Sequence, residues 1–151
     1  MTNNTQIDQQ RLDDVVRVFA ELTEKNLTVS LGSIFHPQAR FKDPFNDVTG
    51  IEAIEKIFAH GFAQCPGMRF VIDHSALAGE RGFVKWYFLC HPEHSQPAQQ
   101  FRIDGVSLLT FDAEGLVVEH EDFWDPAAQI YERIPVFGAL LRWLRKRLAV
   151  R

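Results

Sequence analysis

The chain contains a carboxylate at a position where alternation predicts the protein interior. In Ala39-Arg40-Phe41-Lys42-Asp43, apolar and basic residues alternate, so Asp43 ends the apolar, core-facing side of the segment. An inward carboxylate costs free energy unless it is hydrogen-bonded, solvated in a cavity or neutralised. Asp43 is therefore a candidate pocket residue and a candidate acid or base.

A second group of proton-carrying side chains lies near residue 120. Alternation places His120, Asp122 and Trp124 on one face of a strand that Val118 continues, while Glu119 and its neighbour Glu121 fall on the other face. Two carboxylates beside an imidazole in an apolar cavity can provide both an acid and a base. We predict that His120 and Asp122 share a cavity with Asp43. The alternative is structural: Asp43 caps its Pro turn, and His120 pairs with Asp122.

Helices are predicted mainly in the first part of the chain. Apolar residues recur at helical spacing over 7–25, and a short helix follows at about 28–35. After a strand at 39–43, Thr49 and Glu52 have the spacing of a capping box for a helix that extends to about Phe62.

Strands are predicted from residue 68 to residue 124. Alternation indicates a strand at 68–78, and the nearly continuous apolar run 83–90 predicts a strand covered on both faces. In the strand 100–111, Asp104-Gly105 indicates a bulge or a hairpin turn. The apolar residues lie at odd-numbered positions before Gly105 and at even-numbered positions just after it, which favours the bulge. A turn at 112–115 leads to the last strand, 116–124, and a capped helix follows from Asp125-Pro126.

This order of elements predicts one α+β domain over residues 1–151. Helices followed by a run of antiparallel strands indicate helices packed on the concave face of a strongly bent, mainly antiparallel sheet. The other face of such a sheet remains to be covered, so we expect a homodimer through it.

Composition limits the classes of partner and compartment. The net charge of −4 argues against a nucleic-acid partner. Cys65 and Cys90 form no metal or disulfide pattern, so we expect inert thiols in a reducing compartment. The polar N-terminus lacks an apolar signal core, which predicts a cytoplasmic protein. We expect no cofactor and no metal site, since His91 and His94 lack a second ligand cluster.

Three local features of the chain resemble the nuclear transport factor 2-like superfamily, particularly its bacterial SnoaL-like and ketosteroid isomerase-like members. They are the motif Phe41-Lys42-Asp43-Pro44, Gly50 before a helix, and the turn Phe111–Gly115 before a final strand. The resemblance covers roughly residues 7–131. It implies a cone of bent antiparallel sheet with an apolar pocket closed by helices. Members include isomerases, cyclases, dehydratases, epoxide hydrolases and noncatalytic binding proteins, so the resemblance alone does not assign an activity.

Two subfamilies suggest roles for individual residues. Ketosteroid isomerases carry their base in an Asp-Pro like Asp43-Pro44, but their oxyanion-binding Tyr and acid correspond to Phe19 and Ser107, so we do not expect steroid isomerisation. Limonene epoxide hydrolases place a water-activating Asp at the position of Asp122. The Arg-x-Asp motif that partners this Asp in those enzymes is not matched here, because the corresponding stretch, 84–88, is aromatic. Arg102-Ile103-Asp104 has the right residue types but lies on the following strand, so we do not assign it that role.

The predicted site therefore has an acid/base group, Asp43, Asp122 and His120, and a surrounding pocket. The predicted pocket residues are Phe19, Phe41, Phe58, Val84, Trp86, Phe88, Ser107 and Trp124. We expect a small cofactor-independent enzyme that acts on a small apolar molecule. Two alternatives are a noncatalytic protein that binds such a molecule in the same pocket, and an oligomerisation or membrane-surface adaptor.

The C-terminal helix, at about 137–150, is amphipathic and basic. Five cations lie within the last ten residues, which leaves a charge of −9 on the rest of the chain. Such a helix can lie on anionic lipid. We expect instead that its apolar stripe docks on its own domain or on a dimer mate while the cations face water.

Overall fold

The computed structural model describes residues 7–90 and 101–150. Three helices lie in the N-terminal part: α1 (Gln9–Ala20), α2 (Leu27–Ile34) and α3 (Ile51–Gln64). The six strands are β1 (Phe35–Lys42), β2 (Asp47–Thr49), β3 (Arg69–Ala78), β4 (Arg81–Cys90), β5 (Phe101–Phe111) and β6 (Val117–Phe123). The chain continues through α4 (Pro126–Gln129), the short 3-10 helix η2 (Tyr131–Arg133) and α5 (Phe137–Leu148).

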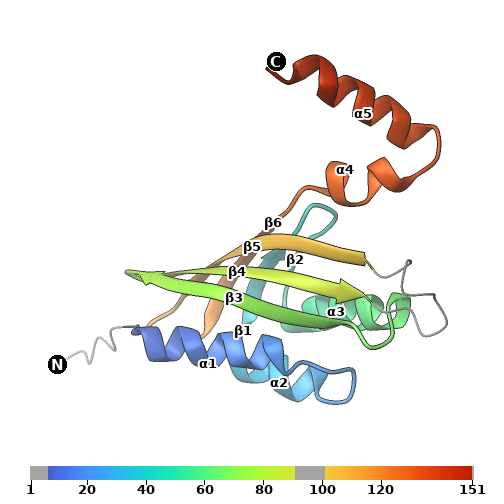
Figure 1. Cartoon of the computed structure of the whole chain (residues 1–151). Coiled ribbons are helices and arrows are strands. Elements are labelled where there is room, and N and C mark those ends of the chain that lie inside the picture. The colour runs from blue at the N-terminus through green and yellow to red at the C-terminus, as the bar shows by residue number, and fades with distance from the viewer. Residues whose placement is uncertain (1–6, 91–100, 151) are drawn as a thin grey trace.

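The strands form one sheet in the order β2-β1-β6-β5-β4-β3. All neighbouring strands are antiparallel except β1 and β6, which are parallel. Helices α1, α2 and α3 lie on one side of the sheet, as Figure 1 shows. The core lies between these layers and includes the fully buried Leu12, Leu31, Ile54 and Leu109. The predicted α+β fold with a mainly antiparallel sheet is therefore confirmed.

One predicted helix end and one predicted helix cap were wrong. The first helix ends at Ala20 rather than near residue 25, because Asn26 organises a turn there: its Oδ1 accepts from the Thr23 N–H at 2.7 Å and its Nδ2 donates to the Glu21 carbonyl. No capping box forms at the start of α3. Thr49 belongs to β2, and the cap residue is Gly50, whose positive φ of 100° lets the chain turn from strand into helix.

The central strands also differ from the prediction. The register between β4 and β5 is continuous, with Trp86 opposite Gly105, so Asp104-Gly105 is neither a bulge nor a hairpin turn. The apolar residues shift from odd to even positions because Val106 lies on the outer sheet face, away from the helices, where it is partly exposed. Strand β4 is not covered on both faces either, since Phe83 on its outer face is 43% exposed.

Irregularities occur instead in β3 and β6. The β3–β4 register shifts between Ile72 and His74, which turns His74 outward, and its side chain is 83% exposed. The β5–β6 register shifts just before Glu119, so Val117 rather than Val118 continues the buried face that includes His120. A bulge reverses the alternation of all following side chains, and local sequence patterns do not locate it.

Cys65 and Cys90 form a disulfide, contrary to the prediction of inert free thiols. Cys65 caps the C-terminus of α3, and Cys90 is the last residue of β4. Folding brings their Cα atoms to 5.7 Å although they are 25 residues apart in sequence. Because a disulfide persists best under oxidising conditions, the inference of a reducing compartment loses its basis.

The C-terminal helix does not dock on the sheet of its own domain, which corrects one form of our expectation. Its main contacts are with η2, and Figure 1 shows it standing away from the body of the molecule. The backbone turns sharply before α5, at Val136, with a φ of 68° that is unusual for a β-branched residue. None of the helices in residues 7–90 and 101–150 combines the length and apolar character needed to cross a bilayer.

Candidate functional site

Asp43 lies just beyond the end of β1, in the turn that leads to β2. Ala39 and Phe41 before it are buried, as alternation requires. The Oδ1 atom of Asp43 accepts hydrogen bonds from the backbone N–H groups of Phe45 and Asn46, both at 2.7 Å. The Asn46 side-chain amide donates to both carboxylate oxygens at 3.0 Å. Asp43 therefore organises this turn.

His120 lies in the interior, on the helix-facing side of β6. It is 5% exposed and surrounded by aromatic rings: its ring centroid lies 4.8 Å from that of Phe41, 5.3 Å from Phe19 and 5.9 Å from Phe35. Its Nδ1 atom is buried and has no hydrogen-bond partner among the described residues. Its Nε2 atom lies 2.7 Å from Asp122 Oδ1. An ionised carboxylate only accepts, so beside ionised Asp122 the Nε2–H group is the donor of this contact.

Asp122 is the centre of a hydrogen-bonded chain across three strands. The Trp86 indole N–H donates to Ser107 Oγ at 2.8 Å, and the Ser107 hydroxyl donates to Asp122 Oδ1. An indole nitrogen can only donate, which fixes the direction of this chain. Asp122 Oδ1 thus accepts from Ser107 on β5 and from His120 on its own strand. The Oδ2 atom has no such partner in the described part of the chain.

Two cavities meet at Asp122. The inner one, of about 30 Å³, extends from Asp122 and His120 toward α1 and α3. The mouth cavity, of about 480 Å³, opens from Asp122 toward Asp43 and is lined mainly by aromatic, aliphatic and sulfur-containing side chains. Its volume lies within the usual range for sites that bind small molecules. Phe58, Phe70 and Trp86 also line both cavities.

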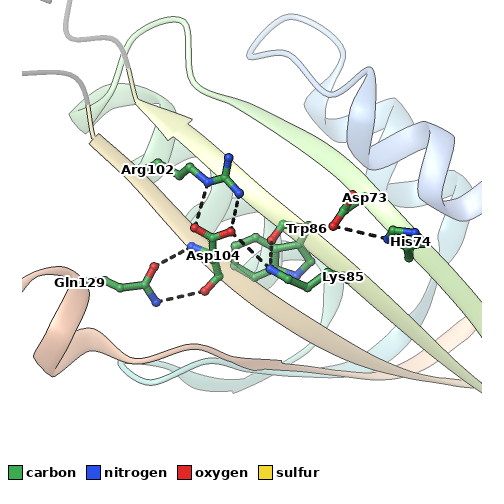
Figure 2. Close-up of polar contacts among 7 residues, drawn as sticks. All are labelled: Asp73, His74, Lys85, Trp86, Arg102, Asp104 and Gln129. Carbon is green, nitrogen blue, oxygen red and sulfur yellow. Dashed lines mark hydrogen bonds and ion pairs between the residues drawn. The ribbon is translucent and has the colours of Figure 1, made fainter.

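The rim of the mouth cavity is formed by the Asp43 turn and by the chain that follows β6. Phe45 packs edge-to-face on Trp124, with ring centroids 5.4 Å apart. Ile130, which follows α4, also lines the mouth. Gln129 ties α4 to β5, since its side-chain amide accepts from the backbone N–H of Asp104 at 2.6 Å and donates to the Asp104 carbonyl at 3.0 Å. Figure 2 shows this pair of contacts where β5 extends beyond its pairing with β6.

The structure places each predicted site residue on at least one of these cavities. The inner cavity is lined by Phe19, Phe58, Val84, Trp86, Ser107, His120 and Asp122. The mouth cavity is lined by Phe41, Asp43, Phe58, Trp86, Phe88, Asp122 and Trp124. Asp43 and Asp122 therefore share the mouth, whereas His120 lies behind Asp122.

Several lining residues were not predicted. Phe70 on β3 lines both cavities, and the two half-cystines line the mouth. The inward side of the alternating strand 68–78 could have indicated Phe70. No such pattern indicates Ile130, which follows the last strand. Its position depends on the contacts of Gln129 that attach α4 to β5.

Arg102 and Asp104 lie on the outer sheet face and not in the cavity. Their side chains form a paired contact at 2.6 and 2.9 Å, and Lys85 Nζ lies 3.4 Å from Asp104, as Figure 2 shows. The hydrogen bond from Arg102, with a further one from Lys85, lowers the pKa of Asp104 although burial opposes this shift. Arg102, Asp104 and Lys85 therefore form a network on the sheet surface.

Metal-ligating side chains do not gather in the described part of the chain. No group of three or more His, Cys, Asp or Glu side chains there is arranged to hold a metal ion. His91 and His94 lie outside the described residues.

Solved structures with the same fold have low sequence identity to this chain. A proposed SnoaL-like polyketide cyclase from Jannaschia sp. CCS1 is 22% identical, with a TM-score of 0.67 over 81% of this chain and 90% of that one. A proposed isomerase of the SnoaL-like family from Agrobacterium tumefaciens str. C58 is 17% identical, with a TM-score of 0.61 over 83% and 99%.

A third structure, a Catenulispora acidiphila DSM 44928 protein with a ketosteroid isomerase-like fold in complex with trimethylamine, is 18% identical. Its TM-score is 0.66 over 77% of this chain and 88% of that one. None of the curated proteins matches this chain. The sequence model of the SnoaL-like domain matches residues 15–120, a span that includes Asp43 and His120. The chain therefore belongs to the SnoaL-like domain family.

Proposed function

We propose that the protein is a cofactor-independent enzyme that transfers a proton on a small, largely apolar molecule held in the mouth cavity. The observation that carries this proposal is the position of Asp122. One of its oxygens is fixed by Ser107 and His120, and the other has no protein partner among the described residues. A carboxylate held in this way beside an apolar cavity is suited to act as a general base.

The proposed roles follow from accessibility. Asp122 Oδ2 accepts a proton from a carbon acid in the mouth cavity, and the resulting carboxylic acid returns that proton to the substrate. His120 and Ser107 are positioning residues, because both act through Asp122 Oδ1. The His120 N–H and the Ser107 O–H also stabilise the carboxylate by hydrogen bonding. Since His120 Nδ1 is sealed behind aromatic rings, it does not reach a molecule in the mouth.

Asp43 is the competing candidate for the base. It shares the mouth cavity with Asp122, but the Phe45 and Asn46 N–H groups and the Asn46 amide occupy its oxygens. These contacts support a structural role for Asp43, and we assign the base to Asp122. The similar proteins described as a cyclase and an isomerase are compatible with acid/base chemistry, although their low identity supports only the fold.

The test uses 2-indanone, a small apolar ketone, as the probe. Its α-protons are acidic, and a base in the cavity should speed their exchange for deuterium from the solvent, which proton NMR follows. Asp122→Asn should lower the protein-dependent rate about a hundredfold or more, because it removes the general base. Asp43→Asn should retain most of the rate, and Asp14→Asn, on the exposed face of α1, is the matched control.

Binding of 2-indanone is measured on the same variants by saturation-transfer NMR. If the wild-type protein binds the probe but does not accelerate exchange, the noncatalytic binding function replaces the proposed enzyme. If Asp43→Asn rather than Asp122→Asn abolishes exchange while the protein stays folded, the base is Asp43 and our assignment is wrong.

A further inference from the structure

The polar side of α5, rather than its apolar side, faces the rest of the protein. Arg142 donates to the carbonyl of Glu132, and Arg145 forms an ion pair with the Glu132 carboxylate at 3.0 Å. Gly138 lies on the same side of the helix, and a Cβ at this position would clash with the Glu132 carbonyl. Residues 138, 142 and 145 are spaced as one helix face. Contacts with η2 therefore fix the orientation of α5.

This orientation leaves the apolar stripe of α5 largely uncovered. The stripe consists of large side chains at helical spacing that are between 46% and 77% exposed, namely Phe137, Leu140, Trp143, Leu144 and Leu148. An amphipathic helix of a globular protein normally turns such a stripe toward the core. Here Arg142 and Arg145 hold another side of the helix against Glu132, and the stripe remains exposed to solvent.

Charge identifies the kind of surface that fits α5. Residues 134–151 contain no Asp or Glu, and the cations Lys146 and Arg147 are exposed at the side of the stripe. Arg147 lies over the Trp143 ring, with its guanidinium carbon 5.6 Å from the ring centroid. A long cationic side chain can then reach the lipid headgroups while its stem and the indole ring remain at the apolar boundary.

We propose that α5 lies in the surface of an anionic lipid bilayer, with its apolar stripe inserted and Lys146 and Arg147 among the headgroups. The 12-residue helix is about 18 Å long, too short to span a bilayer but suited to lie in its plane. Pairing with the α5 of a second copy is less suitable, because it would bring cations together without a carboxylate on either helix.

The bilayer contact would place the mouth cavity close to lipid. Tyr131 packs on Phe45 at the mouth and on Phe137 at the start of α5, with ring centroids 6.4 and 6.2 Å away. A lipophilic molecule leaving the bilayer would therefore meet the mouth first. This consequence rests on the proposed function, whereas the lipid contact itself does not.

Co-sedimentation of the full chain with lipid vesicles tests the proposal. The probes are vesicles of phosphatidylcholine alone and vesicles of phosphatidylcholine mixed with phosphatidylglycerol. We expect binding to the anionic vesicles that weakens as salt is added. Replacing Leu140 and Leu144 by Gln should lower the partition coefficient about tenfold or more for each leucine. Lys146→Gln with Arg147→Gln should abolish the preference for phosphatidylglycerol.

Matched controls use exposed residues on the helical side of the body. Val29→Gln removes an apolar side chain that is 80% exposed on α2, and Lys25→Gln with Lys56→Gln removes two exposed cations. All three changes should leave vesicle binding unaltered. Asp122→Asn should also bind vesicles like the wild type, so a failure of the proposed activity and a failure of lipid binding are distinguishable.

Three results would overturn the proposal. The first is a chain that stays in solution with both kinds of vesicle. The second is vesicle binding that survives both pairs of α5 substitutions, which would assign the contact to another surface. The third is self-association in the absence of lipid that the Leu140→Gln/Leu144→Gln variant loses, which would show that a second copy covers the stripe.

Discussion

The indole ring of Trp86 occupies the space that a side chain at Gly105 would fill. The two residues are opposite each other in the β4–β5 register, and a Cβ at Gly105 would clash with the six-membered ring of Trp86. The ring can therefore lie across β5, where its N–H reaches Ser107 Oγ at 2.8 Å. The absence of a side chain at Gly105 thus allows the contact that begins the hydrogen-bonded chain to Asp122.

Gly105→Ala should displace Trp86 and break its hydrogen bond to Ser107. We expect a destabilisation of about 1–3 kcal/mol, because the methyl group overpacks a buried site. Urea denaturation measures the stability, and tryptophan fluorescence reports the movement of the ring. The control is Gly32→Ala on α2, where a Cβ would meet nothing within 4 Å and helix propensity should stabilise the protein slightly. Equal stabilities of the two variants would contradict this account of Gly105.

Reduction of the Cys65–Cys90 disulfide should lower stability without unravelling the sheet. The bond closes a loop between residues 25 apart, for which chain entropy predicts a contribution of about 3.5 kcal/mol. Urea denaturation with and without dithiothreitol measures this difference. Since the chain has two cysteines in all, the Cys65→Ser/Cys90→Ser variant should not respond to dithiothreitol. A wild-type protein whose midpoint is unchanged by reduction would argue against the bond.

The outer-face pair of Asp104 and Arg102 should make a small contribution to stability that depends on pH. The hydrogen bond from Arg102 lowers the pKa of Asp104 below its ordinary value of 3.8. The contribution is therefore present above that value and is lost as the pH falls through the lower pKa of the folded state. Asp104→Asn should lower the melting temperature by about 1–4 °C at neutral pH, since exposed pairs contribute little.

The difference between Asp104→Asn and the wild type should disappear in acid. Calorimetry over a range of pH gives the comparison, with Glu114→Gln in the exposed 112–115 turn as the control. A difference that persists at the lowest pH would show that the amide disturbs the neighbouring Gln129 contacts rather than the ion pair.

We predict that the outer sheet face pairs with a second copy of the chain. Phe83, Val106 and Phe123 are exposed there, on three adjacent strands. Val106→Lys should shift a dimer toward the monomer in light scattering, because it places a charge in an apolar interface. Val29→Lys on α2 should have no such effect. A wild-type protein that is monomeric at micromolar concentration would contradict this arrangement.

The sequence by itself determined the fold class and the inward face of several strands. Alternation correctly placed Phe41 and His120 in the interior, and the position of Glu121 on the opposite face is confirmed by its contact with Lys42 at 2.7 Å. These properties follow from the two-residue period of a strand, which local sequence carries in full. The motif around Asp43-Pro44 likewise indicated the superfamily, since the turn is built from adjacent residues.

Tertiary structure decided the features that join distant segments. The disulfide depends on α3 ending beside the last residue of β4, and the chain from Trp86 to His120 depends on the register of three strands. The bulge near Val118 changes which side chains face inward without a local signal. Register and helix docking are set by packing of the whole core, whereas periodicity describes one segment at a time.

The orientation of α5 is the clearest case. Periodicity identified its apolar stripe, and the usual inference was that this stripe docks on the protein's own core or on a dimer mate. The contacts of Arg142 and Arg145 with Glu132, ten and thirteen residues earlier, turn the opposite side of the helix inward. The amphipathic pattern indicates that one face of the helix avoids water. Only contacts with the rest of the fold decide which way that face points.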